Sequence, residues 1–116
     1  MSALRGEPAV FLNPDPDRVV RVGEVTIDVA AVSVSLGDVR ERLPWREFQV
    51  LLLLADNAGR VLSADSIRSH VWGDGFVDTT GNLTAHILRL RKRMQRCLGA
   101  DYIRTVRGVG YVLEAP

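Results

Sequence analysis

The sequence predicts an α+β domain in which a four-stranded antiparallel sheet is followed by three helices and a closing β-hairpin. Three observations support this order. Apolar and polar residues alternate in short segments over residues 19–43, apolar residues recur at helical spacing over residues 45–98, and two short apolar segments near the end flank a glycine-rich turn. The 116 residues, 47% of them hydrophobic, suffice for a single core, so one folded domain is expected.

The chain is expected to begin with a flexible arm or linker over residues 1–18, which hold three of the five prolines and no periodic apolar pattern. The folded domain then comprises residues 19–116. Its first part alternates as strands with one buried face do, most clearly where Val25 and Ile27 are separated by a polar residue. Short turns separate the four expected strands, which are residues 19–22, 25–29, 32–36 and 39–43.

The pattern then changes to the helical period. The first helix is expected over residues 45–57, where Glu47 places a carboxylate in the first turn, near the positive end of the helix dipole. The apolar stripe of this helix comprises Phe48, Leu51, Leu52 and Ala55. Residues 60–62 are expected to form a short extended link, and Ser63 is a suitable N-cap for a second helix over residues 64–72.

The third helix is expected over residues 82–98. Apolar residues at steps of three or four predict one core-facing stripe, made of Leu83, Ile87, Leu90, Met94 and Leu98. At 100° per residue, the opposite face collects Ala85, Leu88, Arg89, Lys92 and Arg96. Residues 102–106 and 111–113 then predict the two strands of a hairpin, joined by a turn that contains Gly108 and Gly110.

Positive charge is concentrated near the end of the chain. Residues 81–110 carry a formal charge of +6, whereas the remaining residues carry −5. An isolated basic run is more often the solvated face of a helix than a binding site. Here two separate segments, the third helix and the hairpin, are basic while the rest is acidic. A helix fits the major groove of DNA and a hairpin can reach the neighbouring minor groove, so double-stranded DNA is the expected partner.

Several other classes are disfavoured. The longest apolar run, residues 50–55, is far shorter than the roughly 18 residues needed to cross a bilayer. With no membrane span and no apolar segment typical of a signal peptide, a cytoplasmic location is expected. Cys97 is the only cysteine and is expected to be a buried thiol, and no metal site or cofactor is expected. The chain lacks a phosphate-binding loop and a recognisable catalytic nucleophile, so it is not expected to be an enzyme.

From about residue 20 to residue 113, the chain resembles the winged-helix effector domain of OmpR/PhoB-class bacterial response regulators. The most specific stretch is residues 103–111, Ile-Arg-Thr-Val-Arg-Gly-Val-Gly-Tyr, which matches the wing hairpin of that family at every position. Shorter matches are Glu47-Phe48, Val71-Trp72-Gly73, His86-Ile87 and Leu90-Arg91. The resemblance implies a winged helix-turn-helix fold and sequence-specific binding of double-stranded DNA in transcription regulation.

The resemblance also implies roles for individual residues. Arg89 is expected to contact base edges in the major groove, Ala85 to contact thymine methyl groups, and Arg107 to enter the minor groove. The expected contacts to the DNA backbone come from His86, Arg91, Lys92, Arg96, Arg104, Thr105 and Tyr111. The loop after the second helix corresponds to a segment that touches RNA polymerase in several relatives, and its candidate contacts are Asp74, Phe76 and Asp78. Two copies of the domain are expected to bind side by side on a direct repeat in the DNA.

Some positions depart from the family pattern. Pro44 stands where the family usually has a threonine N-cap, which removes a cap worth about 1 kcal/mol. Gly81, Thr84 and Leu88 stand where many members have charged or polar residues, so a different sequence preference is expected. No receiver domain fits in the chain, which is therefore either an effector regulated in another way or part of a longer protein. The alternative hypothesis is an interaction module whose basic face docks an acidic protein.

Overall fold

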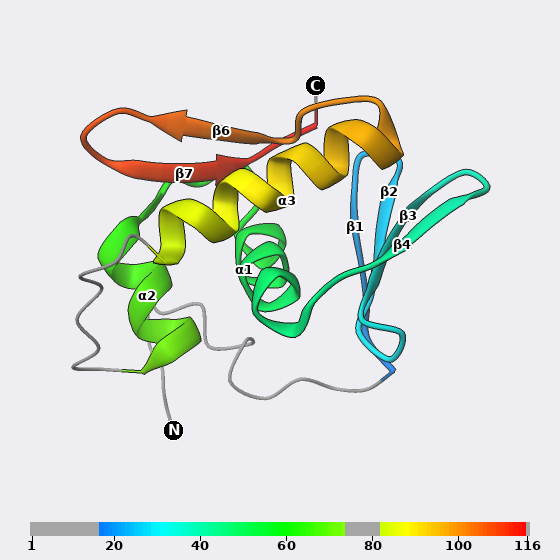
Figure 1. The fold of residues 1–116 in the computed structure, drawn as a ribbon, viewed down its shortest axis with the longest axis horizontal. Coiled ribbons are helices and arrows are strands. Elements are labelled where there is room, and N and C mark those ends of the chain that lie inside the picture. Colours follow the sequence, from blue (N-terminus) through cyan, green and yellow to red (C-terminus); the bar gives the residue numbers. More distant parts are fainter. Residues whose placement is uncertain (1–16, 74–81, 116) are drawn as a thin grey trace.

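The computed structural model describes residues 17–73 and 82–115. The loop residues Asp74, Phe76 and Asp78 lie outside the described residues, as does the expected arm apart from its last two residues. Arg18, expected at the end of that arm, forms an ion pair with Asp56 at the end of the first helix. Figure 1 shows the N-terminal sheet at one end of the molecule and the second helix at the other, with the remaining helices between them.

The N-terminal sheet is a meander of four antiparallel strands in the order β1-β2-β3-β4. The predicted strands are confirmed to within a residue: they are β1 Val19–Val22, β2 Val25–Asp28, β3 Ser33–Leu36 and β4 Val39–Arg42. Ile27 faces Val34 in the register, and both are buried. The third strand starts one residue later than expected, because Val32 has a φ of 50° and belongs to the preceding turn.

Helix α1, Trp45–Asp56, is the centre of the core. Its predicted stripe is buried, but Val50, Leu53 and Leu54 are buried as well, so the helix is covered on nearly all sides. A sequence stripe underestimates this burial because α1 packs against α2 and α3 as well as β1 and β7. Pro44 occupies the N-cap and makes no side-chain capping bond, as the sequence indicated.

Helices α2, Ala64–Trp72, and α3, Asn82–Leu98, have the predicted bounds. The Ser63 hydroxyl accepts a hydrogen bond from the Ser66 amide at 3.0 Å, which confirms the predicted N-cap. All five residues of the predicted α3 stripe are buried. The opposite side of α3 is therefore the side available to a partner. In the part of the chain that the structure describes, no helix combines the length and apolar character needed to cross a membrane.

The C-terminal hairpin consists of β6, Ile103–Val106, and β7, Gly110–Leu113, and belongs to a three-stranded sheet. The third member is β5, Leu62–Ser63, which pairs with β7 where the sequence indicated only an extended link. Gly110 is needed at this pairing, because a Cβ atom there would lie 1.8 Å from the Leu62 carbonyl oxygen. The β5–β7 pairing fixes the hairpin to the start of α2.

Candidate nucleic-acid interface

The exposed side of α3 and the neighbouring hairpin form one surface of mixed apolar and basic character. On α3, Leu88 and the side chain of Arg89 are each 53% exposed, Lys92 and Arg96 are exposed, and Ala85 is half-buried. The structure thus brings Ala85, Arg89, Lys92 and Arg96 onto one face of α3. We call this face, together with the exposed residues of β6 and the hairpin turn, the basic surface. Of the other predicted contacts on this helix, His86 packs against Trp72 and Arg91 bonds to Asp101 and Thr105.

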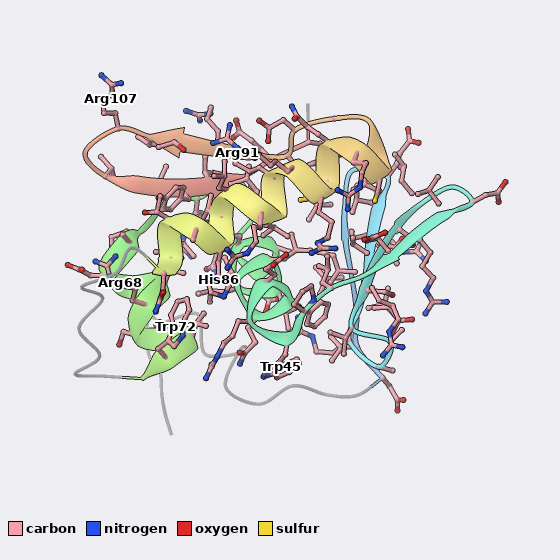
Figure 2. All side chains as sticks on the ribbon, in the orientation of Figure 1. Trp45, Arg68, Trp72, His86, Arg91 and Arg107 are labelled. Carbon is pink, nitrogen blue, oxygen red and sulfur yellow. The ribbon has the colours of Figure 1, made fainter. Side chains whose placement is uncertain are left out.

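The hairpin extends the basic surface beyond α3. Arg107 is exposed in the turn between β6 and β7, and Figure 2 shows its side chain projecting from the outer end of the hairpin, away from the helices. Arg104 and Thr105 are exposed on β6, and the Arg104 Nε donates to Glu114 Oε1 at 3.3 Å. Tyr111 is half-buried and packs against the core. An extended polyanion lying along α3 would therefore meet Arg107 beyond the N-terminal end of the helix (Figure 2).

Arg91 links α3 to the hairpin. Its Nη2 lies 2.9 Å from Asp101 Oδ2 and its Nη1 donates to the Thr105 hydroxyl at 3.1 Å. Asp101 in turn accepts from the Ile103 amide at the start of β6, at 3.2 Å. Because one guanidinium bonds to both the loop before β6 and β6 itself, it connects α3 to the hairpin at two points.

Glu47, which the sequence placed only at the helix dipole, holds two arginines of the basic surface. Its side chain is 4% exposed, and its carboxylate lies 3.4 Å from Arg89 Nε and 3.2 Å from Arg93 Nε. A buried carboxylate requires such partners, because desolvation of an unpaired charge is costly. A sequence signal existed: Glu47 precedes Leu51 and Leu54 at helical spacing and so falls on a core-facing stripe.

Glu41 on β4 contacts the C-terminal half of α3. Its Oε2 lies 3.0 Å from Arg93 Nη1 and 3.8 Å from Arg96 Nη2, and its Oε1 accepts a hydrogen bond from the Cys97 thiol at 3.2 Å. The hydrogen bonds from Cys97 and Arg93 lower the pKa of Glu41 below its ordinary value. Arg93 therefore bridges two carboxylates, those of Glu41 and Glu47, on one side of α3.

These contacts reduce the positive charge that the sequence indicated. Residues 81–110 have a formal charge of +6, but the carboxylates of Glu41, Glu47 and Glu114 pack against them. Residues 81–110 and these three carboxylates together form a cluster with a formal charge of +3. Within the part of the cluster that the structure describes, only Lys92 and Arg107 have no carboxylate partner. Counting charge along the chain therefore overstated the positive charge, because it cannot include residues that are distant in sequence.

The start of α3 packs against α2 through the ring of Trp72, which also contacts Arg46 of α1. His86 Nδ1 lies 2.6 Å from the Asn82 carbonyl oxygen, and its ring meets Trp72 edge-on with the centroids 5.3 Å apart. The Arg46 guanidinium lies 5.8 Å from the centroid of the Trp72 ring. Since a carbonyl oxygen only accepts, Nδ1 of His86 carries a proton and donates this hydrogen bond.

Cys97 is half-buried and packs against the core, so it is less buried than the sequence predicted. Burial and the Glu41 carboxylate both raise the pKa of the Cys97 thiol, so this group is protonated at neutral pH.

We expect the Glu41→Gln variant to shift the midpoint of the pH–rate profile for iodoacetamide alkylation of Cys97 to lower pH, because removal of the carboxylate favours the thiolate. Glu114→Gln, which changes a distant carboxylate, is the matched control and should leave the profile unchanged. An unchanged profile in Glu41→Gln would contradict this account of the thiol.

Comparison with known sequences places the chain among regulatory proteins. The family model "Transcriptional regulatory protein, C terminal" matches residues 37–113. Among curated relatives, the heme response regulator HssR of Staphylococcus saprophyticus is 31% identical over 102 residues, which cover 88% of this chain and 46% of that protein. The transcriptional regulatory protein VxrB of Vibrio cholerae is 38% identical over 99 residues, 85% of this chain and 39% of that protein. The chain spans less than half the length of these relatives.

Solved structures agree with the sequence matches. The DNA-binding domain of E. coli CadC has a TM-score of 0.74 and 31% identity, covering 88% of this chain and 96% of that one. The Klebsiella pneumoniae RstA DNA-binding domain, solved in complex with the RstA box, has a TM-score of 0.72 and 28% identity, covering 84% and 97%. These similarities confirm the winged-helix fold, in which β6–β7 is the wing. The chain therefore belongs to the OmpR/PhoB-type family of C-terminal domains of transcriptional regulatory proteins, a class of regulators and not of enzymes.

Proposed function

We propose that this chain is a sequence-specific, double-stranded DNA-binding domain of a transcription regulator, with α3 in the major groove and the β6–β7 wing at the minor groove. The observation that carries the proposal is the continuity of the basic surface. It runs from the exposed side of α3 to Arg107 at the outer end of the wing, and Arg91 fixes the two elements to each other. The family match and the neighbour solved with its DNA box support the same partner.

In this arrangement the residues divide by the groove that they face. Arg89 and Ala85 contact base edges in the major groove, and Arg107 reads the minor groove, where a narrow A·T-rich tract would hold it best. Glu47 occupies Nε of Arg89 and leaves its terminal nitrogens for a base. The proposed contacts to phosphates are from His86, Arg91, Lys92, Arg96, Arg104, Thr105 and Tyr111.

The proposal is tested by selecting bound duplexes from a random pool with the purified 116-residue chain and then titrating the affinity of the selected duplex against salt. We expect a tandem motif, bound by two copies, and a binding constant that falls by about 0.9 log units per log unit of salt for each phosphate neutralised. Enrichment of no sequence, with only weak binding that salt abolishes, would contradict the proposal. It would favour the alternative in which the basic surface docks an acidic protein.

Arg89 and Arg91 are expected to differ in their effects on binding. Arg89→Ala should relax base preference at one position by about 1–3 kcal/mol, because a base contact is lost. Arg91→Ala should weaken binding to all sequences alike, since it removes a phosphate contact and loosens the wing. Repeating the selection with each variant separates the two roles. If Arg89→Ala selects an unchanged motif, the assignment of Arg89 to a base is wrong.

A further inference from the structure

Leu88 is an exception on α3, because it is a large apolar side chain that the fold leaves exposed. The other large apolar side chains of the helix, Leu83, Ile87, Leu90, Met94 and Leu98, are all buried. Leu88 is 53% exposed, and it directly follows Ile87, so a rotation of about 100° takes it off the core-facing side. Packing inside this chain therefore does not account for a leucine at this position.

The neighbours of Leu88 place it in the middle of the basic surface. Ala85 precedes it by three residues and Lys92 follows it by four, so these three side chains form a strip along the helix. Arg89 lies beside this strip and is held in place by the buried Glu47 carboxylate. The centre of the exposed face, formed by Ala85 and Leu88, is thus apolar, and the cations stand at its side and its end.

The chemistry of the major groove restricts what an apolar strip can recognise. Guanine, adenine and cytosine are distinguished there by their hydrogen-bonding groups, whereas thymine also presents an apolar 5-methyl group. A leucine pressed against purine or cytosine edges would leave those polar groups without partners, which is unfavourable. Contact with a methyl group involves no such loss.

We propose that Leu88 is a specificity-determining residue that selects thymine at one position of each half-site by packing on its 5-methyl group. This inference rests on the proposed function, since it requires α3 in the major groove. It extends that function by assigning a base preference to a residue that carries no hydrogen-bonding group. The recognition helix then reads DNA by two means, a guanidinium held by Glu47 and an apolar strip next to it.

The test replaces each thymine of the selected duplex, one at a time, with deoxyuridine, which removes only the methyl group. Dissociation constants are measured for the unmodified chain and for Leu88→Ala, a change on an exposed helical position that the fold should tolerate. We expect one thymine per half-site whose replacement weakens binding about fourfold, the effect of burying one carbon-sized apolar group. In Leu88→Ala the same replacement should have no effect. Val39→Ala, an exposed apolar residue of the N-terminal sheet, is the matched control and should retain the fourfold effect.

Two results would overturn the inference while leaving the proposed function intact. One is a selected duplex in which no deoxyuridine replacement changes the affinity. The other is that every methyl effect found with the unmodified chain persists at the same size in Leu88→Ala, which would assign all the methyl contacts to Ala85. Failure to select any duplex would instead overturn the proposed function, and this inference with it.

Discussion

Replacing Gly110 with alanine should disrupt the sheet that carries the wing and abolish DNA binding. An alanine Cβ would lie 1.8 Å from the Leu62 carbonyl oxygen, 2.7 Å from the Leu62 carbonyl carbon and 2.8 Å from the Ser63 Cα. These are backbone atoms of β5, so no side-chain rotation relieves the collision, and β5 and β7 must separate. The expected loss in the free energy of unfolding exceeds about 4 kcal/mol, which is exceptional for a single substitution.

Urea unfolding checks this expectation, with Gly108→Ala as the matched control in the same hairpin. Gly108 has a φ of 78° and open space where a Cβ would stand. Its substitution therefore costs only backbone strain, about 1–2 kcal/mol. Equal stability of the two variants would mean that β5 and β7 do not approach each other as closely at Gly110 as these distances require.

The second large effect is expected at Arg93, the cation shared by Glu41 and Glu47. Arg93→Met should lower the free energy of unfolding by about 3 kcal/mol, because it leaves Glu47 buried with Arg89 at 3.4 Å as its remaining cation. This loss is at the lower end of the range for removing one partner of a buried ion pair, because the Arg93 side chain is 24% exposed. Arg96→Met is the matched control, since Arg96 is 66% exposed and 3.8 Å from Glu41, and it should cost less than about 1 kcal/mol.

A double substitution separates charge from packing at this position. Adding Glu47→Gln to Arg93→Met should recover part of the lost stability, because a neutral amide is less costly to bury than an unpaired carboxylate. Chemical denaturation of the four proteins of this cycle gives the coupling free energy. If the two substitutions destabilise the protein additively, Glu47 is not the carboxylate that Arg93 compensates.

The parts of the fold that sequence predicted well are those set by local rules. The bounds of α2 and α3 follow from the Ser63 cap and from the spacing of apolar residues, which act within a few residues of the chain. The strand β5 was not predicted, because it is two residues long and pairs with residues about 50 positions away. Patterns along the chain carry no information on such pairing.

The candidate site divides in the same way. The exposed face of α3 and the exposed hairpin turn were predicted, because helical periodicity and glycine placement determine which residues are exposed. The contacts that the Glu41 and Glu47 carboxylates make with the arginines of α3 were not predicted. Glu41 and Glu47 reach Arg89 and Arg93 across more than 40 residues of sequence. The sequence could therefore identify the cations of the surface but not how firmly each one is held, nor the net charge of the assembled cluster.

The proposed function requires that α3 occupies the major groove while the wing reaches the minor groove. Dimethyl sulfate tests it directly, because this reagent methylates guanine at N7 in the major groove and adenine at N3 in the minor groove. On the selected duplex, we expect protection of guanine N7 within the motif and of adenine N3 at its flank. In Arg107→Ala, the adenine protection alone should be lost. Protection confined to one groove, or equal loss of both signals in Arg107→Ala, would contradict the account.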